Sequence, residues 1–177
     1  MRRHWRRIWS VPLFVEVRGL FMLNWPRALL LAVIASAGCD SHHGVSVEDG
    51  VRAFVQTVAH DITEEGPAAW RRHFADSPSF FMASEGHLVF PNSASATAAI
   101  QDLTRTIKHI ELQWGSDLRV DPLTRDLAVV AASYREVRVN ADGSRVQEAG
   151  FFTGTAEYRN GRWQFRNAHW SVAPPSR

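Results

Sequence analysis

The chain has 177 residues, 11% of them aromatic, and a formal net charge of +2 at pH 7. Its first 38 residues hold six of the 20 basic side chains and one of the 18 acidic ones, so the rest carries 14 basic (20 − 6) and 17 acidic (18 − 1). That slightly acidic remainder excludes the clustered positive face that nucleic-acid binding needs, and its length suits one domain with one core.

Residues 1–38 are predicted to be a secretory signal peptide. An apolar run, "ALLLAVIASAG" at positions 28–38, follows Arg27 and four arginines among the first seven residues. The run is too short for a transmembrane helix, which needs roughly 20 residues, but it fits the apolar region of an export signal. Met22 offers a second start with more ordinary signal dimensions.

Two cleavage sites compete at the end of this leader. Ala35-Ser36-Ala37 is an A-x-A site for ordinary signal peptidase. The stretch "SAGC", residues 36–39, resembles a bacterial lipobox, although Ser36 stands where leucine is usual. Cys39 is the only cysteine, so it has no partner for an intramolecular disulfide. Because lipidation explains this lone thiol, the sequence favours a lipid-anchored protein on the periplasmic side of the cell envelope, or a secreted one if Cys39 is unmodified.

The rest of the chain is predicted to be a tether, residues 39–45, a domain, residues 46–172, and a frayed tail, residues 173–177, with two prolines. Helical spacing of apolar residues and a capping Ser46 predict the first helix. The expected elements are, in chain order, helix 46–62, helix 67–74, two short strands within 79–90, helix 95–107, and β segments at 110–120, 127–139 and 151–171. Helices followed by an antiparallel meander indicate an α+β fold, with a curved antiparallel sheet wrapped around the N-terminal helices.

The last β segment is predicted to be a hairpin, because Asn160-Gly161 favours a two-residue type I′ turn. Residues equidistant from that turn then face each other, and side chains alternate between two faces. The core-facing side carries a set of candidate ligand-binding residues: Phe152, Gly154, Tyr158, Trp163, Phe165, Asn167 and His169.

Within this set, Gly154 is expected opposite Asn167, where it leaves room beside two polar side chains. Buried polar groups need hydrogen-bond partners, so Asn167 and His169 require a ligand, water or a protein group. An apolar cavity with a few polar groups is typical of a small-molecule site. In the alternative interpretation, His169 is bound to a backbone carbonyl in a filled core.

Several of these features, in this order, resemble the nuclear transport factor 2-like superfamily, including its SnoaL-like and ketosteroid-isomerase-like branches. The matching parts are helix 46–62, the "FFMASEGHLVF" hairpin, helix 95–107 and the ending "NGRWQFRNAHWS". The resemblance implies a cystatin-like α+β cone with a pocket at its wide end. It also implies that Trp163, Phe165, Asn167 and His169 point into the cone, and Trp114 is a further candidate for its lining.

The catalytic groups of this superfamily map only in part. Its isomerases use an aspartate base with a Tyr/acid oxyanion pair, and no such set can be assigned here. Its dehydratase-like members use an Asp/His pair, for which Asp61 and His169 are the candidates in this sequence.

Three functions are therefore expected to compete. The first is a pocket domain that binds a small apolar ligand or a partner. The second is a cofactor-independent isomerase, dehydratase or hydrolase, with His169 as general base and Asn167 stabilising an oxyanion. The third is a homodimer formed through the open sheet face near Phe151 and Trp170. No H-E-x-x-H, C-x-x-C, G-x-S-x-G or Walker motif occurs, so no metal or cofactor site is predicted.

Overall fold

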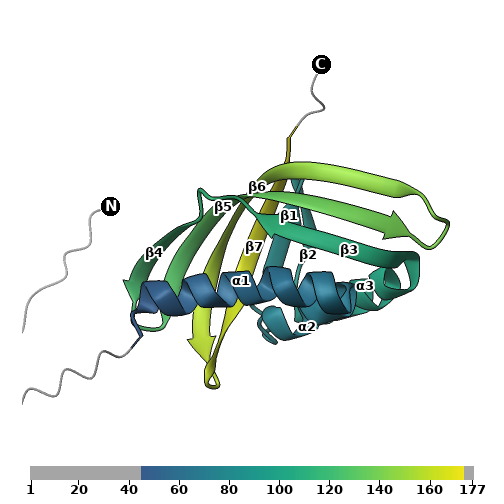
Figure 1. The fold of residues 1–177 in the computed structure, drawn as a ribbon. Coiled ribbons are helices and arrows are strands. Elements are labelled where there is room, and N and C mark those ends of the chain that lie inside the picture. The colour runs from purple at the N-terminus through teal and green to yellow at the C-terminus, as the bar shows by residue number, and fades with distance from the viewer. Residues whose placement is uncertain (1–44, 174–177) are drawn as a thin grey trace, which may run out of the picture. The chain divides into compact units, whose positions relative to one another are not determined.

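The computed structural model describes residues 45–173 (Figure 1). The predicted signal peptide, Cys39 and the tether up to residue 44 lie outside the described residues, as does the tail from residue 174 onward. The elements are, in chain order, α1 Val47–Glu65, the 3-10 helix η1 Pro67–Ala69, α2 Trp70–His73, β1 Phe81–Ser84, β2 His87–Phe90, α3 Ser93–Thr106, β3 Ile107–Trp114, β4 Arg119–Thr124, β5 Leu127–Asn140, β6 Arg145–Arg159 and β7 Arg162–Val172.

Helix α1 begins and ends at the residues that its chemistry favours. Ser46 caps it, because the side-chain oxygen accepts a hydrogen bond from the backbone N–H of Asp49. Its apolar stripe is buried along the whole length, at Val51, Phe54, Val55, Val58, Ala59 and Ile62. The helix ends at Glu65, three residues past its predicted end, and the next residue, Gly66, adopts a positive φ of 77° and donates to the Ile62 carbonyl. In the part of the chain from 45 to 173, no helix is long and apolar enough to cross a membrane.

The strands form one curved, unclosed sheet in the order β2-β1-β7-β6-β5-β3, with β4 also paired to β5. Helix α1 lies along one face of this sheet (Figure 1), where its stripe joins the inward side chains of the strands in one core. The α+β prediction is confirmed. The pairing is mixed, however, because β1 runs parallel to β7 while the other pairs are antiparallel.

The β6–β7 hairpin follows the predicted register only near its turn. Asn160 and Gly161 both have positive φ, 54° and 78°, and Tyr158 pairs with Trp163 and Ala156 with Phe165, as predicted. Thr155 then pairs with Asn167, so Arg166 is an extra residue on β7. A β-bulge of this kind leaves one residue outside the regular ladder.

Two hydrogen bonds from outside the regular ladder accompany this bulge. The side-chain oxygen of Asn167 accepts from the backbone N–H of Thr155 at 3.1 Å. The Phe165 carbonyl accepts from the N–H of Ala75, at 2.8 Å, in the segment after α2. Backbone groups that the bulge would leave unpaired are therefore bonded to other groups.

The bulge reverses the faces of the second half of β7, since side chains alternate with a period of two. Ala168 and Trp170 pair with Gly154 and Phe152 and point inward, and Ala168 is buried. The predicted inward orientation of Asn167 and His169 is therefore wrong.

Candidate functional site

The structure does not bring the two predicted polar groups into a cavity. His169 is exposed and pairs with Thr153 on the outer face of the sheet. Asn167 is half-buried, and its side-chain oxygen, Oδ1, accepts a hydrogen bond from the Thr155 N–H. The geometry assigns Asn167 to the bulge, not to a ligand.

The hollow predicted beside Gly154 is filled. A β-carbon added to Gly154 would lie 2.8 Å from the ring carbon Cζ of Phe152 and 2.8 Å from the backbone carbonyl oxygen of Asn167. Phe152 and Phe165 are fully buried, with ring centroids 5.0 Å apart. Both rings belong to the core, and neither lines the apolar-walled cavity described below.

None of the other predicted ligand-binding residues, Trp114, Tyr158 and Trp163, lines the cavity described below. Trp114 donates its indole N–H to the Val55 carbonyl at 2.8 Å and packs against the core. Tyr158 is 45% exposed, and its ring lies edge-on to that of Trp163 near the hairpin turn.

Asp61 pairs with a different histidine from the predicted one. Its carboxylate lies 2.9 Å from Nε2 of the buried His73, and Arg72 donates to the same oxygen at 3.1 Å. Burial lowers the pKa of His73, against the opposing effect of Asp61. Although desolvation acts to raise it, hydrogen bonds from Arg72 and His73 hold the pKa of Asp61 below its ordinary value. This cluster joins α1 to α2 and does not line the cavity described next.

Because Asn167 has a structural role at the bulge, Asn167→Ala is expected to lower the free energy of unfolding by about 1 kcal/mol, through the unpaired N–H of Thr155. His169→Ala, on the exposed side of the same strand, should change it by less than about 0.5 kcal/mol. Urea denaturation measures both. A larger loss for His169 than for Asn167 would contradict this assignment.

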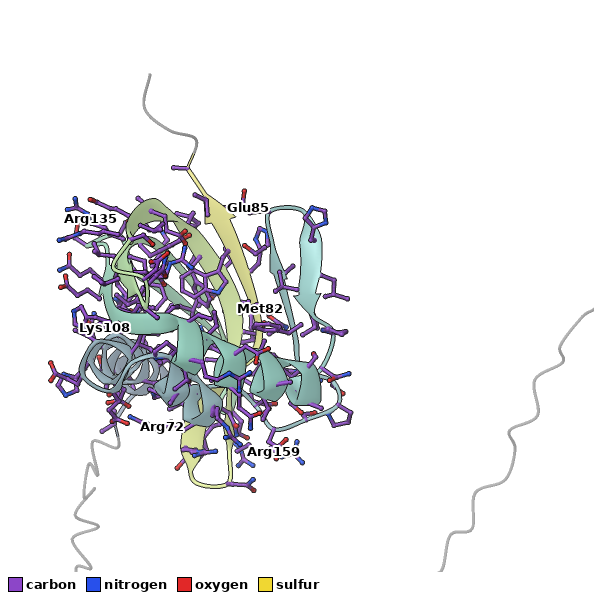
Figure 2. The ribbon with its side chains drawn as sticks, turned by 90° about the vertical axis from the view of Figure 1, so that its right-hand side faces the viewer. Arg72, Met82, Glu85, Lys108, Arg135 and Arg159 are labelled. Carbon is purple, nitrogen blue, oxygen red and sulfur yellow. The ribbon has the colours of Figure 1, made fainter. Side chains whose placement is uncertain are left out.

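A cavity of about 170 Å³ lies between the sheet and the helices α3 and η1. Most of its wall is apolar, and its polar side chains come from the neighbouring strands β5 and β6 and from the end of β1. Its lining residues are Pro67, Trp70, Phe74, Met82, Ser84, Phe90, Ile100, Leu103, Ile107, Ile110, Glu136, Arg138, Glu148 and Trp170. Met82 reaches it from the β1–β2 hairpin (Figure 2), and Glu85 at the tip of that hairpin fixes the end of β7 by accepting from the N–H of Val172 at 2.7 Å.

The charged part of the wall is a pair of glutamates bridged by one arginine. Glu136 on β5 and Glu148 on β6 are direct cross-strand partners, an arrangement that is destabilising for like charges. Arg138, two residues along the same face of β5, lies between them. Its Nε is 3.0 Å from Glu136, and its Nη2 is 2.7 Å from Glu148.

Glu136 is the most perturbed acid of this cluster. Its side chain is 12% exposed, and burial, with a smaller contribution from Glu148, raises its pKa to about 7 despite the opposing effect of Arg138. The hydroxyl of Tyr134 lies 3.5 Å from Glu148, and burial together with the two glutamates raises the pKa of that tyrosine as well. A carboxyl group that titrates near neutral pH in an apolar cavity can both take up and release a proton during a reaction.

The sequence pattern of β5 indicates the cluster of Glu136, Arg138 and Glu148, although it matches no known motif. Tyr134, Glu136 and Arg138 continue the inward alternation of the buried Ala128, Val130 and Ala132 on β5. Charged residues at core-facing positions of a strand indicate a polar site, since burial without partners is unfavourable. No group of three His, Cys, Asp or Glu side chains suited to a metal occurs within residues 45–173.

Comparisons with known proteins bear on the fold. No protein-family model and no curated protein matches the sequence. Among solved structures, a nuclear transport factor 2-like superfamily protein from Salmonella enterica serovar Typhimurium is similar, with 14% identity, a TM-score of 0.62, and coverage of 73% of this chain and 94% of its own.

Two further structures carry names of enzymes. A candidate scytalone dehydratase from Novosphingobium aromaticivorans matches at 9% identity and a TM-score of 0.59, over 71% of this chain and 83% of its own. A hexachlorocyclohexane dehydrochlorinase, LinA type 2, matches at 13% identity and a TM-score of 0.56, over 72% of this chain and 93% of its own. As the resemblance in the sequence implied, the chain has the nuclear transport factor 2-like fold.

Proposed function

We propose that this domain binds a small molecule with a largely apolar body in the cavity between the sheet and α3. The observation that carries the proposal is the combination of about 170 Å³ of apolar-walled space with three charged side chains at one side. A cavity of roughly 150 Å³ lined by Leu, Ile and Phe is large enough to hold benzene. The expected ligand is therefore about the size of one six-membered ring, far smaller than a steroid.

Filling the cavity tests this proposal. Leu103 on α3 lines the space, so Leu103→Trp should occupy it with an indole and weaken the binding of benzyl alcohol, a ring-sized probe, by about tenfold or more. Titration calorimetry or ligand-observed NMR measures the affinity. Val89→Trp adds the same indole at a position that is 43% exposed and outside the cavity, and it should leave the affinity unchanged. Equal binding by wild type and Leu103→Trp would refute the site.

The second candidate is catalysis of proton transfer by Glu136. It is favoured by the pKa of about 7 of this carboxyl group and by Arg138, whose guanidinium can stabilise developing negative charge. An isomerase, dehydratase or hydrolase of this kind would use Glu136 in the role that the sequence suggested for His169. The dehydratase and dehydrochlorinase names of two structural neighbours fit such chemistry. Wild type, but not Glu136→Gln, should then exchange carbon-bound protons of a ring-sized ketone with D₂O.

Export and lipid anchoring through Cys39 stay predictions of the sequence. We propose them with the ligand site, since an anchored domain with an apolar cavity suits the capture of small molecules in the cell envelope. The intact mass of the protein purified from membranes would show the added lipid.

A homodimer through the outer sheet face also stays a prediction. Phe151 is 42% exposed on that face, whereas Trp170, expected beside it, lines the cavity.

A further inference from the structure

The charges that line the cavity do not balance. Its lining includes two carboxylates, Glu136 and Glu148, and one guanidinium, Arg138. When all three groups are ionised, the wall carries one negative charge in excess. The nearest β3 neighbour of Glu136 across the sheet is Leu112, which brings no compensating charge.

Arg138 is already engaged on both sides. Its Nε and Nη2 atoms lie 3.0 Å and 2.7 Å from the two glutamates. An anionic ligand would either separate one of these ion pairs or bind at the remaining nitrogen, Nη1, next to two carboxylates, and both arrangements are unfavourable in a largely apolar space. The cluster therefore disfavours carboxylate or phosphate ligands.

The remaining wall of the cavity is rich in aromatic rings. Trp70 and Phe74 stack with their centroids 5.0 Å apart, and Trp170 meets Trp70 edge-on at 5.8 Å. Phe90 completes the aromatic lining. Such rings offer a large apolar surface for the body of a ligand to contact.

From the excess carboxylate and the aromatic wall together, we infer that the ligand class of this cavity is a small organic monocation, an amine or ammonium group on an apolar body of about one ring. This inference rests on the proposed small-molecule site and adds the charge of the ligand. The ammonium group lies at Glu136 and Glu148, and the apolar body contacts the Trp and Phe rings.

Cation binding is coupled to the ionisation of Glu136. The charged and titratable groups around this carboxyl are Arg138 and Tyr134 on its own strand and Glu148 on β6. In the empty protein a proton neutralises Glu136 below its pKa of about 7, and the cation replaces that proton. Since only about one molecule in ten is ionised at Glu136 at pH 6, the apparent affinity for a cation should fall about tenfold between pH 8 and pH 6.

Three probes with the same ring test the inference: benzylamine, benzyl alcohol and benzoate, measured by calorimetry on the purified protein at pH 8 and pH 6. The expected order of affinity at pH 8 is cation, then neutral, then anion. Only the cation should weaken at pH 6, because the alcohol does not depend on Glu136 ionisation. In Glu136→Gln the ratio of the benzylamine affinity to the benzyl alcohol affinity at pH 8 should fall to about one.

The control for this variant is a glutamate outside the cavity. Glu111→Gln removes a carboxylate that is 45% exposed and lies outside the cavity, and it should retain the cation preference. Binding of benzyl alcohol without any preference for benzylamine, or a preference that survives in Glu136→Gln, overturns the inference and leaves the small-molecule site standing. If none of the three probes binds, the proposed site itself fails, and the inference fails with it.

Discussion

At pH 8, Glu136→Gln is expected to raise the free energy of unfolding by about 3 kcal/mol, because the wild-type protein must hold a buried, ionised carboxylate, which also faces Glu148. The pKa of Glu136 rises from an ordinary value of 4.5 to about 7 in the folded protein. The folded state therefore binds more protons than the unfolded state between these two pH values. Stability from this group is fully present below pH 4.5 and is lost as the pH rises through 7.

The glutamine variant lacks this titration and resembles the protonated acid at every pH. The difference in free energy of unfolding between the variant and wild type should thus be close to zero near pH 4.5 and reach its full size at pH 8. Urea denaturation at both pH values measures it. Asp61 and His73 titrate in both proteins, so their effects cancel in the difference. Glu111→Gln, at an exposed position, should stay within about 0.5 kcal/mol of wild type throughout. A loss of stability in Glu136→Gln that is the same at all pH values would mean that the ion pair with Arg138 outweighs burial.

Phe152→Ala is expected to lower the free energy of unfolding by about 3–5 kcal/mol, the usual range for truncating a fully buried phenylalanine. The ring contacts three other aromatic rings at centroid distances of 4.7–5.2 Å: Trp114, Phe165 and Trp170. Its removal leaves a void that these rigid neighbours cannot fill. Urea denaturation measures the loss.

The adjacent residue provides the control for this variant. Phe151 points to the outer face and is 42% exposed, so Phe151→Ala should cost about 1 kcal/mol or less. If Phe152→Ala does not fold, Phe152→Leu keeps most of the volume and should still cost more than Phe151→Ala. Comparable, small losses at both positions would show that Phe152 is not a core residue and would restore its predicted role in a ligand site.

Local chemistry made most of the fold predictable. The apolar stripe of α1, its Ser46 cap, and the Asn160-Gly161 turn each depend on residues close in sequence, and each was found where expected. The parallel pairing of β1 with β7 was not predicted, because it joins segments about 85 residues apart, and this pairing depends on how the whole sheet curves.

Asn167 and His169 were placed on the wrong face because one extra residue shifts the alternation of side chains along β7. The bulge at Arg166 is accompanied by bonds to Thr155 and Ala75, and the second of these comes from a distant segment. The sequence of the strand nevertheless indicates an irregularity. Phe165 and Trp170 are five positions apart, so both can face the core only if the alternation of side chains is interrupted. The stripe of Tyr134, Glu136 and Arg138 on β5 was equally readable, since regular alternation places it inside.

The extra residue in β7 also has a consequence for how this protein is compared with others of its shape. An alignment that matches the final strands letter by letter, with no gap at Arg166, equates outward positions of this chain with inward positions of a strand that has no bulge. His169 would then be assigned the place of an interior residue, although Trp170 is its spatial counterpart. Residue equivalences in the last quarter of the domain have to be drawn from superposed coordinates, with a one-residue insertion at position 166.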